Sequence, residues 1–286
     1  MIKFFSLSSG SCGNCYFICS EEPGREPAGI LIDAGVSIRK LKKALSDKSY
    51  SPGSFSSILV THDHLDHIRH LGSFCKNLCK PVYATPVLHA ALASHSFTKD
   101  HIASCRRELS PEEWNEIIPG RVSARCFIVP HDATETVGYA LSIDGYSLVI
   151  MTDIGRMTEE ALRYASAADT VVIESNYDMD MLIAGPYTHE LKMRICQGNG
   201  HLSNDECAAA IRQFYTPRLR HIFLCHLSEN NNTPDRAYRC AADALGQTGL
   251  RPVSRNSWLF TGPEGRTVTL RTLPRRTPSQ LFTLDG

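Results

Sequence analysis

The sequence lacks a net charge and lacks long hydrophobic runs. Its 30 basic side chains balance its 30 acidic ones, so the whole molecule has no basic field that would demand a nucleic-acid partner, although a local site stays compatible with one. Two basic runs, Arg39 to Lys43 and Arg271 to Arg276, are expected to be solvated faces. No stretch reaches the roughly 18 apolar residues of a membrane span, and the first residues do not predict a signal peptide. We therefore expect a cytoplasmic protein that makes no contact with a membrane.

Paired cysteine motifs are lacking as well. The eleven cysteines are scattered, and neither Cys12-x-x-Cys15 nor Cys75-x-x-x-Cys79 has the second matching pair that a metal or redox motif would need. We expect free thiols, as in a reducing cytoplasm. No repeat or low-complexity segment divides the 286 residues, and nothing in the pattern indicates an oligomeric state.

A cluster of metal-binding residue types, by contrast, directly follows a short apolar run. Ile58-Leu59-Val60 has the length and β-branched content of a buried strand, and His62, His64, Asp66 and His67 come after it. His62 and His64 share a face on an extended backbone, whereas Asp66 and His67 point elsewhere if a helix begins between the two pairs. One loop can thus supply ligands to two neighbouring divalent metal ions. Imidazole with carboxylate suits zinc, manganese or iron.

Three further candidates stand where predicted strands end. His131, Asp153 and His226 each come directly after an apolar run of the kind that forms a buried strand. Buried strands deliver their terminal side chains to a rim that neighbouring strands share, so these three residues and the histidine-rich loop are expected to converge. We therefore predict one metal site built from seven side chains.

Apolar runs of two kinds alternate along the chain. Strands are predicted at 2–7, 16–19, 29–35 (ending in a turn), 58–60, 82–84, 126–129, 137–143, 146–151, 170–173 and 221–225. Helices are predicted after Ser37, from about 65 toward 74, from 86 through 92, over 159–164, from 203 to 215 and from 233 to 245. Two β-rich halves with helices outside them predict an α/β fold, a four-layer αββα sandwich in one domain over 1–271. Residues 95–120 follow no clear pattern, and 272–286 are expected to be a loose tail.

The spacing of the ligand candidates resembles that of the metallo-β-lactamase superfamily over about residues 1–270. All seven ligand positions of that superfamily are filled with the expected residue types: His62, His64, Asp66, His67, His131, Asp153 and His226. The resemblance implies that His62, His64 and His131 take the first metal. Asp66, His67 and His226 would take the second, with Asp153 bridging both. Two such cations lower the pKa of a shared water and clamp an ester during displacement, so a metal-bridging hydroxide oriented by Asp66 is the expected nucleophile.

The second half of the chain carries a clue to the substrate. The segment from Gly200 to Asn204, which contains His201, and the segment from His226 to Ser228 resemble motifs of tRNase Z-type phosphodiesterases. In that family a glutamate after an earlier strand pairs with the motif histidine to protonate the leaving group, and Glu174 and His201 match these two positions. A carboxylate beside an imidazole favours the imidazolium, which is the form that a general acid needs near neutral pH.

Three segments resemble the YycJ/WalJ family of metallo-β-lactamase-fold proteins more closely. They are residues 5–14, 200–204 and 226–234. This resemblance implies a 5′-to-3′ exonuclease that acts on DNA, with a role proposed in mismatch repair. Cys12 stands where the family more often has a small residue, and the departure touches no ligand.

Several polar groups are candidates for holding a substrate phosphate. Arg156, Lys192 and Arg194 lie shortly after or before predicted site residues, and guanidinium and ammonium groups both bind phosphate oxygens. The small-residue loop at Ser9, Gly10 and Ser11 is expected to offer backbone N–H groups to a terminal phosphate.

Four other functions compete with the DNA exonuclease. A tRNase Z-like RNA phosphodiesterase would use the same residues. A thioesterase or lactamase on this scaffold would lack the Glu174/His201 pair, and a diiron flavoprotein usually has a glutamate at the position of His64. A non-catalytic metal-binding protein would have no need for all seven ligand positions.

Overall fold

The long strands form because their alternating hydrophobic side chains enter two different buried layers. In β1 (Ile2–Ser8), Phe4 packs between two sheets, whereas Phe5 and Leu7 pack against helices. Strand β11 (Thr170–Glu174) alternates in the same way between the middle layer and the opposite group of helices. Both sheets are therefore buried on two faces at their centres.

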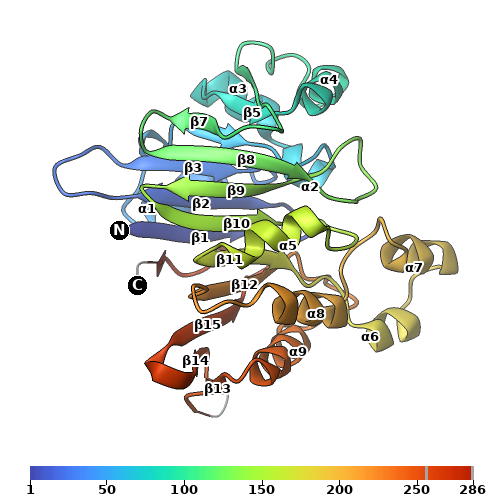
Figure 1. Cartoon of the computed structure of the whole chain (residues 1–286). Helices are drawn as coiled ribbons and strands as arrows, with labels where there is room; N and C mark the ends of the chain where they lie inside the picture. The colour runs from blue at the N-terminus through green and yellow to red at the C-terminus, as the bar shows by residue number, and fades with distance from the viewer. Residues whose placement is uncertain (255–256, 285–286) are drawn as a thin grey trace.

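The computed structural model describes residues 1–254 and 257–284, and within them two mixed sheets lie face to face (Figure 1). The first sheet has seven strands in the order β16 (Phe282–Thr283), β1, β2 (Cys15–Ser20), β3 (Ala28–Ile32), β4 (Ser57–Leu59), β5 (Val82–Ala84) and β6 (Arg106–Glu108). The second has nine, in the order β13 (Arg251–Pro252), β14 (Leu259–Thr261), β15 (Thr267–Thr272), β12 (His221–Cys225), β11, β10 (Tyr146–Met151), β9 (Val137–Ile143), β8 (Val122–Ile128) and β7 (Asn115–Ile118).

Helices cover the outer face of each sheet. The first sheet packs against α1 (Ile38–Ser46), α3 (Leu71–Leu78) and α4 (Pro86–Ser94). The second packs against α5 (Glu159–Ser166), α8 (Asn204–Phe214) and α9 (Pro234–Gln247). This order of layers confirms the predicted αββα sandwich in a single domain. The shorter helices are α2 (Leu65–Ile68), α6 (Met179–Ala184), α7 (His189–Cys196), η1 (Pro52–Ser54) and η2 (Pro263–Gly265).

The helix that precedes β12 begins as its sequence predicts. The Ser203 hydroxyl accepts a hydrogen bond from Glu206 N at 3.1 Å, and the Glu206 carboxylate accepts one from Ser203 N at 2.8 Å. This reciprocal capping box fixes the start of α8. It also holds the preceding segment, which contains His201, in one orientation.

The prediction of a loose C-terminal tail is wrong. After β15 the chain crosses to the first sheet, where β16 pairs antiparallel with β1, and the side chains of Leu273 and Leu284 are buried. The pairing of β16 uses backbone hydrogen bonds. These leave no periodic pattern in a segment that buries so few apolar side chains.

Residues 95–120, which follow no sequence pattern, include the edge strands β6 and β7. All three residues of β6 are exposed, so no alternation of apolar and polar residues marks it. The predicted helix from about 65 toward 74 is interrupted, because α2 and α3 are separate helices. Within residues 1–254 and 257–284, the helices are all too short or too polar to cross a membrane. All eleven cysteines lie in this part and are free thiols.

Candidate metal centre

The two sheets bring their carboxyl ends, and the polar residues that follow them, to one site. Strands β8 and β10 both run antiparallel to β9, and β10, β11 and β12 are parallel, so all four end at the same edge. His131, Asp153 and His226 follow three of these strands and Glu174 ends the fourth. The parallel strands β3 and β4 of the other sheet end in Asp33 and in the histidine-rich loop.

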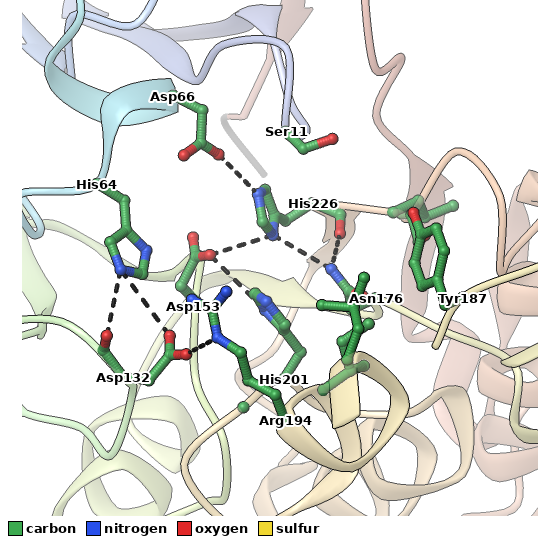
Figure 2. Close-up of a pocket in the computed structure, with 15 residues that line it drawn as sticks. Ser11, His64, Asp66, Asp132, Asp153, Asn176, Tyr187, Arg194, His201 and His226 are labelled. Atoms are coloured by element: carbon green, nitrogen blue, oxygen red, sulfur yellow. Dashed lines mark hydrogen bonds and ion pairs between the residues drawn. The ribbon is translucent and has the colours of Figure 1, made fainter. Parts of the chain in front are cut away.

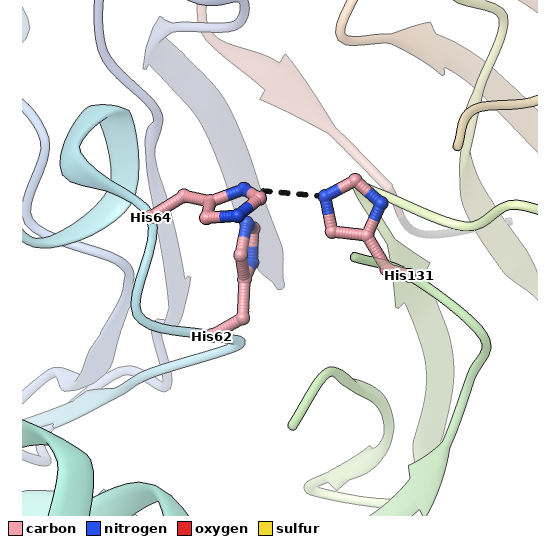
Figure 3. A group of neighbouring side chains, drawn as sticks. All are labelled: His62, His64 and His131. Carbon is pink, nitrogen blue, oxygen red and sulfur yellow. Dashed lines mark hydrogen bonds between the residues drawn. The ribbon is translucent and has the colours of Figure 1, made fainter. Parts of the chain in front are cut away.

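The seven predicted ligands converge as the sequence indicates. His62, His64 and His131 form one group, in which His131 Nε2 lies 3.3 Å from His64 Nδ1 (Figure 3). Asp66, His67 and His226 form a second group. Within each group, one ligand atom from every residue lies within 4.8 Å of the others.

Asp153 lies between these two groups. Its Oδ2 is 3.1 Å from His67 Nε2, and its Oδ1 is 3.7 Å from His131 Nε2 and 3.2 Å from His226 Nδ1. A carboxylate in this position can contribute one oxygen to each of two cations. Figure 2 shows Asp153 facing Asp66 and His226 at the centre of the pocket.

Each histidine of the site uses one ring nitrogen to bind the protein, which leaves the other for a metal. His62 Nδ1 contacts Thr61 Oγ1 at 3.0 Å, and His131 Nδ1 donates to the Gly200 carbonyl at 2.7 Å. The remaining three histidines do the same: His64 Nε2 to Asp132 O, His67 Nδ1 to Asp33 Oδ2 and His226 Nδ1 to Glu174 Oε1. Such hydrogen bonds fix the tautomer that presents a lone pair to a metal.

Two buried polar atoms of the site fit a cation and have no other partner. His62 Nε2 and Asp153 Oδ2 are inaccessible to solvent and make no hydrogen bond in the described part of the chain. A buried polar atom without a partner costs about 1–3 kcal/mol, and a divalent cation would satisfy both atoms. The residues present therefore fit a metal centre with nitrogen and oxygen ligands, and the chain is a protein built to bind divalent metal ions.

The electrostatics of the site suit the same role. Burial lowers the pKa of His62 well below its usual value, and the charge of His67 lowers it further. Burial also lowers the pKa of His131, so both imidazoles stay neutral and keep a lone pair. Burial on its own would raise the pKa of Asp153, but the surrounding histidines, His226 foremost, hold it well below its usual range. The site thus presents an ionised carboxylate among neutral ligands.

A buried aspartate that sequence reasoning missed orients the second group. Asp33 has no exposed surface, and its Oδ2 accepts a hydrogen bond from His67 Nδ1 at 2.6 Å. Its two carboxylate oxygens also accept hydrogen bonds from the backbone N–H and the hydroxyl of Thr61, both at 2.8 Å. Because Asp33 follows the predicted strand that ends near it, the strand-end signal that identified Asp153 could have found it too.

The backbone of the histidine-rich loop is held from the other side by the loop at Asn14 and Gly35. Asn14 N donates to Asp66 O at 2.7 Å, and the Asn14 side-chain amide donates to Asp66 Oδ2 at 3.0 Å. A Cβ at Gly35 would lie 1.7 Å from Asp66 O, so only glycine allows this approach. The metal-ligating face of α2 is thereby fixed before any metal binds.

Substituting Asp33 by asparagine is expected to weaken divalent-metal affinity by about 10- to 100-fold, because His67 loses the carboxylate that fixes its tautomer and raises its basicity. Asparagine tolerates the positive φ of 63° at this position, so the backbone should not change. The affinity can be measured by competition with a chelating dye. Asp63→Asn is the matched control, since Asp63 lies in the same loop but binds Thr134. Equal affinities in the two variants would contradict the role of Asp33.

Glu174 and His201 form an ion pair beside the ligand groups. Glu174 Oε1 accepts from His201 Nδ1 at 2.7 Å, and Oε2 accepts from the backbone N–H groups of Ile154 and Leu202. Burial on its own would raise the pKa of Glu174 and lower that of His201, but their mutual charge and hydrogen bond reverse both effects. The pair therefore favours a carboxylate and an imidazolium. His201 lines the pocket, and its Nε2 is the nitrogen left for a bound molecule.

The pocket over the site is walled by α7 on one side and by the N-terminal loop on the other. Arg194 of α7 forms an ion pair with Asp132, whose backbone oxygen binds His64 (Figure 2). Ser11 is exposed on the opposite wall. Sequence reasoning missed Asp132 and Tyr187, which also line the pocket, because neither follows an apolar run.

The predicted phosphate-binding residues divide into two sets. Arg194 and Ser11 line the pocket, as the prediction requires. Arg156 is exposed outside it, and Lys192 Nζ instead donates to Ile183 O at 2.6 Å. Neither residue is placed to hold a phosphate in this pocket, because both lie beyond its walls.

The small-residue loop is already engaged within the protein. Gly10 N donates to Asn14 Oδ1 at 2.9 Å, and Ser9 N donates to Arg275 O at 3.2 Å. These two amides are not available to a phosphate, which corrects that part of the prediction. The Ser9 hydroxyl accepts from His226 N at 3.0 Å, so the loop positions a ligand candidate.

Comparison with known proteins gives consistent results. A family model described as a beta-lactamase superfamily domain matches residues 29–226. The chain is 30% identical over 248 residues to exodeoxyribonuclease WalJ of Streptococcus pneumoniae, covering 87% of this chain and 90% of that protein. It is 30% identical over 256 residues to exodeoxyribonuclease YycJ of Bacillus anthracis, covering 87% and 91%.

Solved structures share the fold at low sequence identity. Zinc-bound PqqB from Methylobacterium extorquens is similar with a TM-score of 0.65 and 18% identity, covering 98% of this chain and 99% of that one. The human short form of tRNase Z gives a TM-score of 0.55 and 15% identity, covering 79% and 93%. At these identities the likeness concerns the fold alone.

Proposed function

The chain belongs to the metallo-β-lactamase superfamily and is a metal-dependent hydrolase, and on this basis we propose that it is a dinuclear 5′-to-3′ DNA exonuclease of the cytoplasm. The observation that carries the proposal is the Glu174–His201 pair, 2.7 Å apart and directly beside the ligand groups. A proton donor next to a metal centre is useful when the leaving group is a poorly leaving alkoxide, as in a phosphodiester. Relatives that are 30% identical and named exodeoxyribonucleases support DNA as the substrate.

The proposed metal ligands follow from the two groups. His62, His64 and His131 would hold one cation, Asp66, His67 and His226 would hold the other, and Asp153 would serve both: these are the groupings that the geometry offers. Imidazole and carboxylate donors suit zinc, manganese or iron. Bound there, two divalent cations supply Lewis acidity toward the phosphodiester and lower the pKa of an attacking water.

The residues of the chain would then perform the proton transfers. Asp66, with Oδ2 3.3 Å from His226 Nε2 and its side chain 18% exposed, is placed to accept a hydrogen bond from a water at the pocket floor. His201 would donate its Nε2 proton to the departing sugar oxygen. Glu174 holds His201 in the donor form and, by binding His226 at 3.0 Å as well, couples the proton donor to the metal site.

Two pocket residues are proposed to hold the substrate phosphate. Arg194 presents a planar guanidinium that now pairs with the exposed face of Asp132, and a phosphate is a stronger bidentate partner. Ser11, on the facing wall, offers a hydroxyl at the pocket entrance. A strand end lying between these walls would place its terminal phosphodiester over the ligand groups.

The test of this function is one comparison of substrates. Metal-reconstituted protein is incubated with end-labelled single- and double-stranded DNA and with RNA, each with and without a 5′ phosphate. We expect mononucleotides to be released from the 5′ end of DNA. Cleavage confined to RNA 3′ trailers would favour a tRNase-type activity, and no cleavage of any nucleic acid together with thioester turnover would favour a small-ester hydrolase.

A further inference from the structure

Two basic runs that lie far apart in the sequence meet beside the metal centre. Lys40, in the first turn of α1, donates from Nζ to the backbone oxygen of Arg276 at 2.7 Å. The helix thereby contacts the C-terminal segment between β15 and β16. Sequence analysis treated the two runs as separate solvated faces, since nothing in the pattern shows that they adjoin.

The C-terminal part of this junction is attached to the pocket wall. The backbone oxygen of Arg275 accepts hydrogen bonds from Ser9 N at 3.2 Å and from Ser8 Oγ at 2.7 Å. The Arg275 guanidinium donates to the carbonyl of Ser228, which lines the pocket. Positive charge therefore begins at the pocket rim and continues outward to α1.

The charges of this region are mostly uncompensated. Arg39 and Lys43, one helical turn apart on α1, are exposed, and among the described residues no carboxylate lies within 4.0 Å of either. Arg276 pairs with Glu229 at 2.5 Å, but both side chains are exposed, at 62% and 45%, so the pair is weak and easily exchanged. The region keeps a positive balance despite the neutral charge of the whole chain.

We infer that this surface binds the phosphate backbone of the nucleic-acid strand whose end occupies the pocket. The surface consists of Arg39, Lys40, Lys43, Arg275 and Arg276, and we call it the basic rim. The inference rests on the proposed function, because it is the continuity with the pocket that selects a nucleic-acid strand as the occupant. Contacts of this kind are independent of base sequence, as an exonuclease that digests any strand requires.

The test compares two triple variants that each lose three positive charges. The first is Arg39→Gln/Lys43→Gln/Arg276→Gln. The control is Lys76→Gln/Lys99→Gln/Arg212→Gln, which changes exposed residues that do not line the pocket and have no carboxylate partner among the described residues. Binding of a 5′-fluorescein-labelled single-stranded DNA 20-mer is measured by fluorescence anisotropy between 50 and 300 mM salt, and hydrolysis of bis(4-nitrophenyl) phosphate by the wild-type protein is measured in parallel (roughly the range in which counterion release is linear).

Each lost contact to a single strand should lower the slope of log K against log salt by about 0.7, which at 0.1 M salt is about a fivefold loss of affinity. The basic-rim variant should therefore bind ten- to a hundredfold more weakly with a slope lower by about 2, and the control should bind like the wild type. Equal binding by the two variants, or no binding by the wild type, overturns the inference. Salt-dependent binding that only the basic-rim variant loses, without hydrolysis of any phosphodiester by the wild type, would support the basic rim and refute the proposed function.

Discussion

Substitution of Asp66 by alanine is expected to reduce phosphodiester turnover by about a thousandfold or more, because it removes both a ligand of the second group and the group placed to orient water. Asp66 Oδ2 lies 3.3 Å from His226 Nε2 and 3.5 Å from His67 Nε2, so no other carboxylate takes an equivalent position between these two residues. The fold should persist, since the side chain is 18% exposed and the loop backbone is held by Asn14.

Asp63→Ala provides the matched control for this variant. Asp63 lies three residues earlier in the same loop and binds Thr134 N at 3.2 Å, away from both ligand groups. Turnover, metal content and circular dichroism should be measured together for the two variants. Wild-type turnover in Asp66→Ala would contradict the assignment, and a folded Asp66→Ala protein that has lost activity would exclude a non-catalytic metal-binding role.

Substitution of His201 by alanine should lower kcat on DNA by about 10²- to 10⁴-fold, the usual contribution of a general acid. The effect should depend on the leaving group. A sugar alkoxide needs a proton as it departs, whereas 4-nitrophenolate departs without one, so bis(4-nitrophenyl) phosphate should lose far less activity. His201 is accessible enough for the fold to tolerate its loss, with 21% of its side chain exposed.

The dependence on the leaving group separates catalysis from structure. His189→Ala serves as the control, because His189 is exposed at the start of α7, in the same region of the chain. An equal loss on both substrates in His201→Ala would mean that His201 only supports the site. A kcat ratio between the two substrates that matches the wild type would therefore contradict the general-acid role.

The sequence predicted the layers of the fold and the convergence of the ligand candidates for the same physical reason. Parallel strands that are buried on both faces read as apolar runs, and their carboxyl ends share an edge, so His131, Asp153 and His226 could be placed together without coordinates. The sequence did not show the backbone pairing of β16 or the use of the Ser9 and Gly10 amides within the protein. Backbone hydrogen bonds do not depend on which side chain is present, and no pattern of residue types records them.

The contacts between distant segments were also out of reach. Asp33 could have been recognised from its place after a strand, but its partner His67 is known only once β3 and β4 are paired. Likewise, the contact between Lys40 and Arg276 joins residues that the sequence separates by 236 positions. Such juxtapositions follow from the packing of the layers, and each of the two segments taken alone has the composition of an ordinary solvated surface.

The most direct test of the metal centre is an anomalous difference map from crystals of the protein grown with zinc or manganese and measured at the absorption edge of that metal. We predict two peaks, one among His62, His64 and His131 and the other among Asp66, His67 and His226, with Asp153 between them. A map without a peak at these side chains, from crystals in which they hold the positions described, would contradict the account.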